Sequence, residues 1–240
     1  MRRRLKWLIP VAALVLLAAA FLIYTGDYYH ADGEAAAAFS SDGAVRVSRT
    51  DYGWFFDGPS DEKALVFYPG GKVEETAYAP LLRLFAENGL DVCLVSMPFR
   101  LAVFGMNKAA KVMERYGYER WYAGGHSLGG AMAAVYAARR PEKLDGLVLL
   151  AAYPTKELDG RLVSVSVYGS EDGVLDREKL EEGRRYFSGP YTEYVIEGGN
   201  HAQFGSYGPQ AGDGTAAITA EAQRAEAVRA VLEGLSRPAE

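Results

Sequence analysis

Cysteine is almost absent from this chain of 240 residues, and Cys93 is the only example. One cysteine cannot form an internal disulfide or a metal site built from several thiolates. Cys93 lies in the apolar run Val92–Val95, which is typical of a core strand. Histidine is also scarce, and the spacing of His30, His126 and His201 matches no metal-binding motif. The sequence therefore predicts neither a disulfide nor a metal site.

Basic residues are not in excess, so the usual signature of a nucleic acid partner is missing. The chain has a net charge of −5. Four of its 26 bases, clustered between Arg2 and Lys6, and one of its 31 acids lie before residue 31. Residues 31–240 therefore carry 22 basic and 30 acidic side chains, a net charge of −8. This balance argues against nucleic acid binding and gives no basic surface for anionic lipids.

Long hydrophobic runs are absent except for one, from Trp7 to Tyr24, which contains no charge. A run of 18 residues is just long enough to cross a bilayer as a helix, and aromatic residues bracket it as they do at membrane interfaces. Because the basic cluster precedes the run, the amino end is expected to stay in the cytoplasm. We therefore predict an anchor and tether in residues 1–30 and an extracytoplasmic globular domain in residues 31–240.

A cleaved signal peptide is the alternative interpretation of this segment. The apolar run is longer than the usual hydrophobic region of a signal peptide, and no A-x-A cleavage site follows it closely. The alanines at Ala35–Ala38 could supply a cleavage site, although they lie at some distance. An uncleaved single-pass anchor is the prediction, and secretion after cleavage remains the alternative.

Apolar runs and helical patterns alternate from residue 64 onward. Two short segments at 45–47 and 52–56 precede them and resemble antiparallel strands. Such alternation predicts an α/β fold, a mostly parallel sheet with helices on both faces. The predicted strands lie at 64–68, 91–97, 121–123, 147–151, 162–168 and 191–196, and the predicted helices at 78–85, 109–116, 131–138, 176–186 and 225–235.

The chemistry is organised around Gly124–Gly130, which reads GGHSLGG. A Gly-x-Ser-x-Gly string between a strand and a helix is the pattern of a nucleophile elbow. The sharp turn strains its central residue, and side chains at the flanking positions would collide with the neighbouring strand and helix. Gly125 and Gly129 therefore fit the turn, and Ser127 is the predicted nucleophile at the carboxyl edge of the sheet.

A carboxylate and a histidine follow the serine in the order that this elbow requires. Asp172 lies between Glu171 and Gly173 after the strand at 162–168, and Glu171 is the lesser candidate for the acid. His201 follows two glycines after the last strand. His126 is too close to Ser127 along the chain to act as its base. Ser127, Asp172 and His201 form the predicted triad.

Acyl transfer also needs fixed N–H donors for the oxyanion of the tetrahedral intermediate. Leu128, at the start of the elbow helix, is expected to supply one N–H. The loop Pro69–Lys72 follows a buried strand and is expected to supply the other. Gly71 is the first choice and Lys72 the second, because sequence does not reveal the backbone direction there.

These motifs together resemble the alpha/beta-hydrolases, and most closely small bacterial members similar to dienelactone hydrolases that carry an N-terminal membrane segment. The resemblance covers about residues 45–235. Dienelactone hydrolases use a cysteine nucleophile, whereas position 127 is serine, so their particular substrate is not implied. The matching stretches are Tyr68–Glu74, Gly125–Gly130, Gly169–Asp172 and Gly199–Gly205.

The resemblance implies hydrolysis of an ester, thioester or amide through an acyl-enzyme on Ser127. His201 would move the proton, Asp172 would orient the imidazole, and no metal or organic cofactor would be needed. An acyltransferase that uses an alcohol in place of water is one alternative. A membrane-anchored binding module without turnover is another, since fold alone does not imply function.

The lid of this fold usually follows the strand after the elbow helix, where only residues 153–161 are available. Nine residues with a proline and a glycine favour a loop over a helical cap, so we expect minimal or no lid and a small acyl group. The loop at 205–214 is the alternative lid. The predicted walls of the substrate site are Phe99, Arg100, Phe104, Tyr153 and Phe204.

Overall fold

A computed structural model describes residues 2–236 and places a single eight-stranded sheet at the centre of the protein. The strand order is β1-β2-β4-β3-β5-β6-β7-β8. The first two strands run antiparallel to their neighbours, and the other six are parallel to one another. The strands are β1 Arg46–Arg49, β2 Gly53–Asp57, β3 Lys63–Tyr68, β4 Asp91–Val95, β5 Arg120–His126, β6 Gly146–Leu150, β7 Val163–Gly169 and β8 Tyr191–Ile196.

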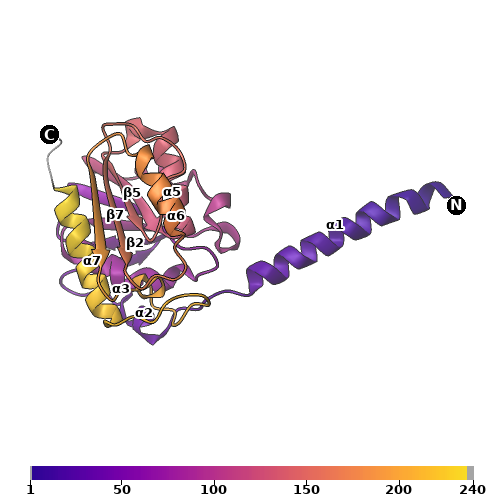
Figure 1. Cartoon of the computed structure of the whole chain (residues 1–240), viewed down its shortest axis with the longest axis horizontal. Helices are drawn as coiled ribbons and strands as arrows, with labels where there is room; N and C mark the ends of the chain where they lie inside the picture. Colours follow the sequence, from indigo (N-terminus) through magenta and orange to yellow (C-terminus); the bar gives the residue numbers. More distant parts are fainter. Residues whose placement is uncertain (1, 237–240) are drawn as a thin grey trace.

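Helices cover both faces of this sheet, as the alternation predicted (Figure 1). Five helices belong to the domain: α2 Gly33–Ala37, α3 Ala79–Glu87, α4 Lys108–Met113, α5 Leu128–Arg139 and α7 Ala220–Leu235. A sixth, α6 Arg177–Gly183, follows residues 170–176, the loop that carries Asp172 and is called the acid loop below. Short 3-10 turns lie at Glu75–Tyr78, Pro98–Arg100, Ala102–Phe104, Pro141–Lys143, Arg184–Tyr186 and Ala202–Phe204.

Alternating side chains of the parallel strands fill two separate cores. Leu65 and Phe67 pack with α3 and α7, whereas Val66 and Cys93 pack with α4 and α5. Strands that are buried on both faces explain why these segments read as continuous apolar runs. Cys93 is fully buried, as predicted, and burial raises the pKa of its thiol to about 12. The thiol therefore stays protonated and inert at neutral pH.

The elbow strand is longer than its apolar run indicated. β5 extends through Gly124 and Gly125 to His126 because both glycines pair with β3 on one side and β6 on the other. The strand lies near the middle of the sheet, with three parallel strands, β6, β7 and β8, on one side of it. Ser127 consequently follows a rigid, doubly paired strand at the carboxyl edge.

The N-terminal segment forms one long helix, α1 Arg2–Gly26, which projects away from the domain (Figure 1). Its portion from Ile9 to Gly26 is long and apolar enough to cross a membrane. The chain then joins the domain: Tyr29 pairs with Val73 in a parallel bridge, and α2 follows with Ala35 fully buried. Residues 25–41 thus contain both a short tether and a packed helix.

No helix is present in the described residues between β6 and β7. This connection is the place where a cap would be inserted, and it runs as turns and irregular chain from Ala151 to Leu162. The prediction of minimal or no lid at this position is confirmed.

Candidate active site

Ser127 occupies the sharp turn between β5 and α5, in a backbone conformation that non-glycine residues rarely adopt. Its φ is 52° and its ψ is −125°. The turn is held because the Ser127 N–H donates to the Leu150 carbonyl at 2.9 Å. Strain of this kind persists only where the surroundings over-determine it, and it is common at catalytic positions. The side chain remains partly exposed, so it is open to a substrate.

The glycines that flank Ser127 are required by close backbone contacts. A Cβ on Gly125 would lie 2.3 Å from the Tyr68 carbonyl oxygen, and one on Gly129 would lie 2.1 Å from the same atom. Both distances are far below van der Waals contact, and neither backbone can retreat. The structure therefore confirms the prediction that side chains at positions 125 and 129 would collide with neighbouring chain.

Gly129→Ala should destabilise the fold, although alanine normally favours a helix by about 1 kcal/mol over glycine. The clash with the Tyr68 carbonyl should outweigh that gain and lower the free energy of unfolding by about 3 kcal/mol or more. Urea denaturation followed by circular dichroism measures the change. Gly117→Ala is the matched control, because a Cβ there meets nothing within 4 Å. Equal stability of the two variants would contradict the packing argument.

Asp172 and His201 lie together in the interior at the carboxyl ends of β7 and β8. The His201 Nδ1 and the Asp172 Oδ2 are 2.8 Å apart, and both side chains are almost fully buried. The second carboxylate oxygen accepts the N–H groups of Val174 at 2.9 Å and Leu175 at 2.8 Å. These bonds fix the carboxylate, so it can hold the imidazole in one orientation.

Glu171, the second candidate for the acid, points elsewhere. Its side chain is exposed and accepts the hydroxyl of Ser170 at 3.0 Å. The tight turn thus aims consecutive carboxylates in opposite directions, Asp172 inward and Glu171 outward.

The Nε2 of His201 is buried and has no hydrogen-bond partner among residues 2–236. No hydrogen bond joins it to the Ser127 hydroxyl within the described residues. Bonds between nucleophile and base are often long in ligand-free structures and tighten when substrate binds. An oriented imidazole with a free Nε2 has the arrangement that a general base needs.

His126 lies beside this imidazole and is held in a neutral state. The two rings are 4.4 Å apart between centroids. Burial, and then the neighbouring His201, hold the pKa of His126 well below its usual value. Its Nδ1 lies 2.8 Å from the Tyr78 hydroxyl, which also accepts the Gly70 N–H at 3.1 Å. A neutral His126 adds no positive charge next to the proton that His201 must receive.

Tyr78 and Asp213 are two contributors to the site that sequence reasoning missed. Tyr78 was assigned to a helical apolar stripe, and nothing local reveals that its hydroxyl reaches the loop at Gly70. Asp213 accepts the N–H of Gly173 at 3.1 Å, of His201 at 3.1 Å and of Ala202 at 2.8 Å. Its carboxylate thereby ties the loop of the acid to the loop of the histidine.

The two candidate oxyanion loops face each other. A Cβ on Gly71 would lie 2.8 Å from the Leu128 side chain, so these residues are neighbours. The N–H groups of Gly71 and Leu128 have no hydrogen-bond partner within residues 2–236, whereas the Lys72 N–H donates to the Arg100 carbonyl at 3.0 Å. Only the first two N–H groups are therefore free to meet an oxyanion.

The five residues predicted to line the substrate site lie in three separate regions of the structure. Phe99, Arg100 and Phe104 lie on loops next to α1 and contact that helix or its tether. Tyr153 packs with the small apolar cluster around Tyr168 and Leu175 behind the acid loop. Phe204 is fully buried and packs on the His126 ring at 5.5 Å between centroids. Phe204 therefore supports the histidines from within the core and does not line an open groove.

Residues 64–225 match the model of a protein family described as the alpha/beta hydrolase family. This stretch contains the elbow, the acid loop and the histidine loop. No curated protein matches the chain.

Solved structures of the same fold include Est1E from Butyrivibrio proteoclasticus, at 13% identity and a TM-score of 0.57 over 81% of this chain and 100% of that chain. A dienelactone hydrolase from Anabaena variabilis is similar at 11% identity and a TM-score of 0.54, over 79% of this chain and 98% of that chain. A bacterial membrane phospholipase A, described as a virulence factor, is similar at 16% identity and a TM-score of 0.55, over 99% of this chain and 100% of that chain. At these identities the likeness shows the fold alone.

Proposed function

Because this chain belongs to the alpha/beta hydrolase family, we propose that it is a serine hydrolase that cleaves a small acyl ester through Ser127, His201 and Asp172. The observation that carries the proposal is the His201 imidazole. Asp172 fixes it from one side at 2.8 Å, and its other nitrogen has no partner within residues 2–236. The ring lies 4.4 Å from that of His126, the residue before the strained Ser127. A binding module would have no need for such a buried, oriented and unpartnered base.

The reaction would begin when the Ser127 hydroxyl oxygen attacks the acyl carbonyl carbon while His201 Nε2 takes the hydroxyl proton. The tetrahedral oxyanion would accept hydrogen bonds from the Leu128 and Gly71 N–H groups. His201 would then return the proton to the leaving oxygen as its bond to the acyl carbon breaks. Water would repeat the sequence on the acyl-enzyme, releasing the acid and restoring the serine.

Existing hydrogen bonds favour Gly71 over Lys72 as the second N–H donor to the oxyanion. The Lys72 N–H already donates to the Arg100 carbonyl, and removing it from that bond would leave the carbonyl unsatisfied. The Gly71 and Leu128 N–H groups need no such exchange. Leu128 also begins α5, where the unpaired N–H groups and the helix dipole favour negative charge.

Trapping the acyl-enzyme tests the proposal directly. Rapid mixing with p-nitrophenyl acetate should release about one p-nitrophenol per protein before steady turnover, because acylation precedes slower hydrolysis. Acid quenching followed by peptide mass spectrometry should find one acetyl group on Ser127. Release of p-nitrophenol without an acetylated serine would contradict the mechanism. Transfer of the acetyl group to an added alcohol in preference to water would identify an acyltransferase.

We expect the enzyme to hydrolyse esters of short acyl chains more efficiently than esters of long ones. The connection between β6 and β7 supplies no cap, so little apolar surface can enclose a long acyl group. Each buried methylene is worth about 0.8 kcal/mol, and the open site forgoes most of this gain. We expect kcat/KM for monomeric p-nitrophenyl esters to be highest for acetate or propionate and to fall with length. A steady rise toward long chains would show that another segment, with residues 205–214 as the candidate, acts as a lid.

We also propose that α1 is an uncleaved anchor that keeps the catalytic domain outside the cytoplasm. The support is that the end of the helix is built into the domain: Thr25 is buried, and the Tyr29 N–H donates to the Lys72 carbonyl at 2.8 Å. The alternative cleavage region lies in α2, whose Ala35 is fully buried. Protease added to intact spheroplasts should remove the domain and leave the amino end.

A further inference from the structure

An aromatic cluster joins the apolar part of α1 to the loop beside the candidate active site. Phe21 of α1 contacts Phe99 at 5.1 Å and Phe104 at 6.0 Å between ring centroids, and the two loop rings are 5.8 Å apart. Phe99 and Phe104 follow β4 at the carboxyl edge of the sheet, the edge that holds Ser127. The loop and the helix therefore meet on the side of the domain where the chemistry lies.

The position of Phe21 along α1 sets the depth of this contact. Phe21 lies inside the apolar span Ile9–Gly26, five residues before its end. At 1.5 Å per residue, it is roughly 8 Å from the end of the span along the helix axis. When α1 crosses a bilayer, the rings that touch Phe21 must reach the boundary between headgroups and acyl chains. Figure 1 shows the domain seated at this end of the helix.

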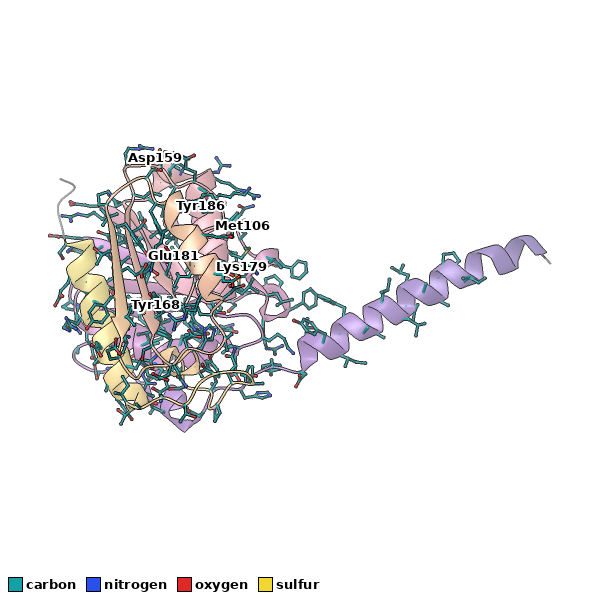
Figure 2. All side chains as sticks on the ribbon, in the orientation of Figure 1. Met106, Asp159, Tyr168, Lys179, Glu181 and Tyr186 are labelled. Carbon is teal, nitrogen blue, oxygen red and sulfur yellow. The ribbon has the colours of Figure 1, made fainter. Side chains whose placement is uncertain are left out.

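Exposed apolar side chains are concentrated in the same loop. Outside α1, the exposed large apolar residues among those described are Phe99 at 48%, Val103 at 44%, Phe104 at 54% and Val174 at 36%. The first three form one segment, which we call the apolar rim. Val174 lies two residues after Asp172, at the same edge of the sheet. Met106, just after the rim, lies on the side of the domain nearest α1 (Figure 2).

Cations and aromatic rings surround the rim in the way that is typical of a membrane interface. The Lys72 ammonium lies 4.4 Å from the centre of the Tyr24 ring and 3.3 Å from the Asp27 carboxylate. The Arg100 guanidinium lies over the Tyr28 ring at 3.3 Å. The first two contacts hold the end of α1 to Lys72, which follows Gly70 and Gly71, and the third holds the tether to Arg100, next to Phe99.

Where α1 meets the loops at residues 72 and 99–100, the backbone is strained, and hydrogen bonds join these segments to one another. Lys72, Phe99 and Arg100 have φ values of 58°, 54° and 57°, which non-glycine residues rarely adopt. The Lys72 N–H bonds to the Arg100 carbonyl, and the Lys72 carbonyl accepts the Tyr29 N–H. The helix end, the apolar rim and the oxyanion loop thus form one connected unit, so the anchor fixes the height of the site above the bilayer.

We propose that the apolar rim docks on the lipid bilayer beside α1 and that the substrate is a short acyl ester of a membrane-resident amphiphile. The inference rests on the proposed function for its chemistry. Its partner is a lipid surface, because the rim touches a residue inside the spanning part of the helix. A substrate at the interface reaches Ser127 from the rim side and does not need to leave the bilayer.

The depth of the rim can be measured with an environment-sensitive fluorophore. Val103→Cys in the full chain, labelled and placed in phosphatidylcholine vesicles, should be strongly quenched by brominated lipids. Glu142→Cys is the matched control, because it precedes β6 at the opposite edge of the sheet and is exposed. We expect no quenching there. Equal quenching at both positions, or none at position 103, would overturn the docking proposal whatever the catalytic mechanism is.

The substrate class is tested with Val103→Asp, since Val103 belongs to the rim and not to the catalytic machinery. The probes are 1-oleoyl-2-acetylglycerol in phosphatidylcholine vesicles and soluble p-nitrophenyl acetate. We expect the variant to lose roughly tenfold in acetyl release from the vesicles, equivalent to about 1.4 kcal/mol of interfacial binding, and to keep its rate on the soluble ester. Equal rates for wild type and variant on the vesicles would overturn the inference. If the wild type hydrolysed neither probe, the proposed function would be refuted, and the depth measurement would still test the docking of the rim.

Discussion

Ser127→Ala is expected to abolish turnover of a short ester and covalent labelling by a fluorophosphonate probe together. The strained turn places this hydroxyl at the carboxyl end of β5, and alanine removes the nucleophile that we propose His201 activates. The loss in kcat should approach about 10⁶-fold, the scale seen when a triad nucleophile is removed. The measurements are steady-state hydrolysis of p-nitrophenyl acetate and in-gel fluorescence after labelling.

A second serine provides the control for this experiment. Ser188→Ala alters an exposed side chain away from the elbow and should leave both readouts unchanged. The fold of Ser127→Ala should also remain intact, since alanine keeps the Cβ and the backbone bond to Leu150. Labelling or turnover that survives in Ser127→Ala would show that another residue is the nucleophile.

Asp172→Asn should reduce kcat by about 10⁴-fold while leaving the protein folded. The Asp172 Oδ2 contacts His201 Nδ1, and an amide nitrogen in that place would donate a hydrogen bond where the imidazole must donate its own. His201 would then carry its proton on Nε2, which could not accept the proton of the Ser127 hydroxyl. The backbone bonds from Val174 and Leu175 could still be accepted by the remaining oxygen, so the loop should stay in place.

Glu171→Gln is the matched comparison, because it makes the same chemical change one residue away. Its side chain is exposed, so we expect wild-type turnover. Thermal unfolding of both variants separates a catalytic effect from a loss of fold. A strong effect of Glu171→Gln together with a weak effect of Asp172→Asn would reverse the assignment of the acid.

The parts of this protein that depend on local chain geometry were accessible from the sequence. Continuous apolar runs indicated strands buried on both faces, and their alternation with helical patterns indicated a parallel sheet. The glycines around Ser127 indicated a turn too tight for side chains, and the clash distances at Gly125 and Gly129 give the same reason. The placement of Ser127, Asp172 and His201 at one edge of the sheet followed from the strand ends at which they lie, because parallel strands bring their carboxyl ends to one edge.

Other features required contacts between segments that are far apart in the chain. Sequence left Gly71 and Lys72 as alternatives, and the bond from the Lys72 N–H to Arg100 is what distinguishes them. Phe204 reads like an exposed loop aromatic, yet packing on His126 buries it completely. Tyr78 fits a helical stripe, and only its bond with His126 reveals its place beside the site.

What the sequence by itself determined was the fold class and the tight turn around Ser127, since both rest on steric limits of the backbone and on the period of apolar residues. The triad of Ser127, Asp172 and His201 remains a prediction. Only the tertiary structure showed how particular groups are oriented and what they contact. It showed which candidate N–H groups lack a partner, which carboxylate turns inward, and which aromatic rings contact α1. The physical reason is that hydrogen bonds and ring contacts depend on distances of a few ångströms between segments that are far apart in the chain, as Tyr78 and His126 are at 48 positions. Those distances are set by packing of the whole domain.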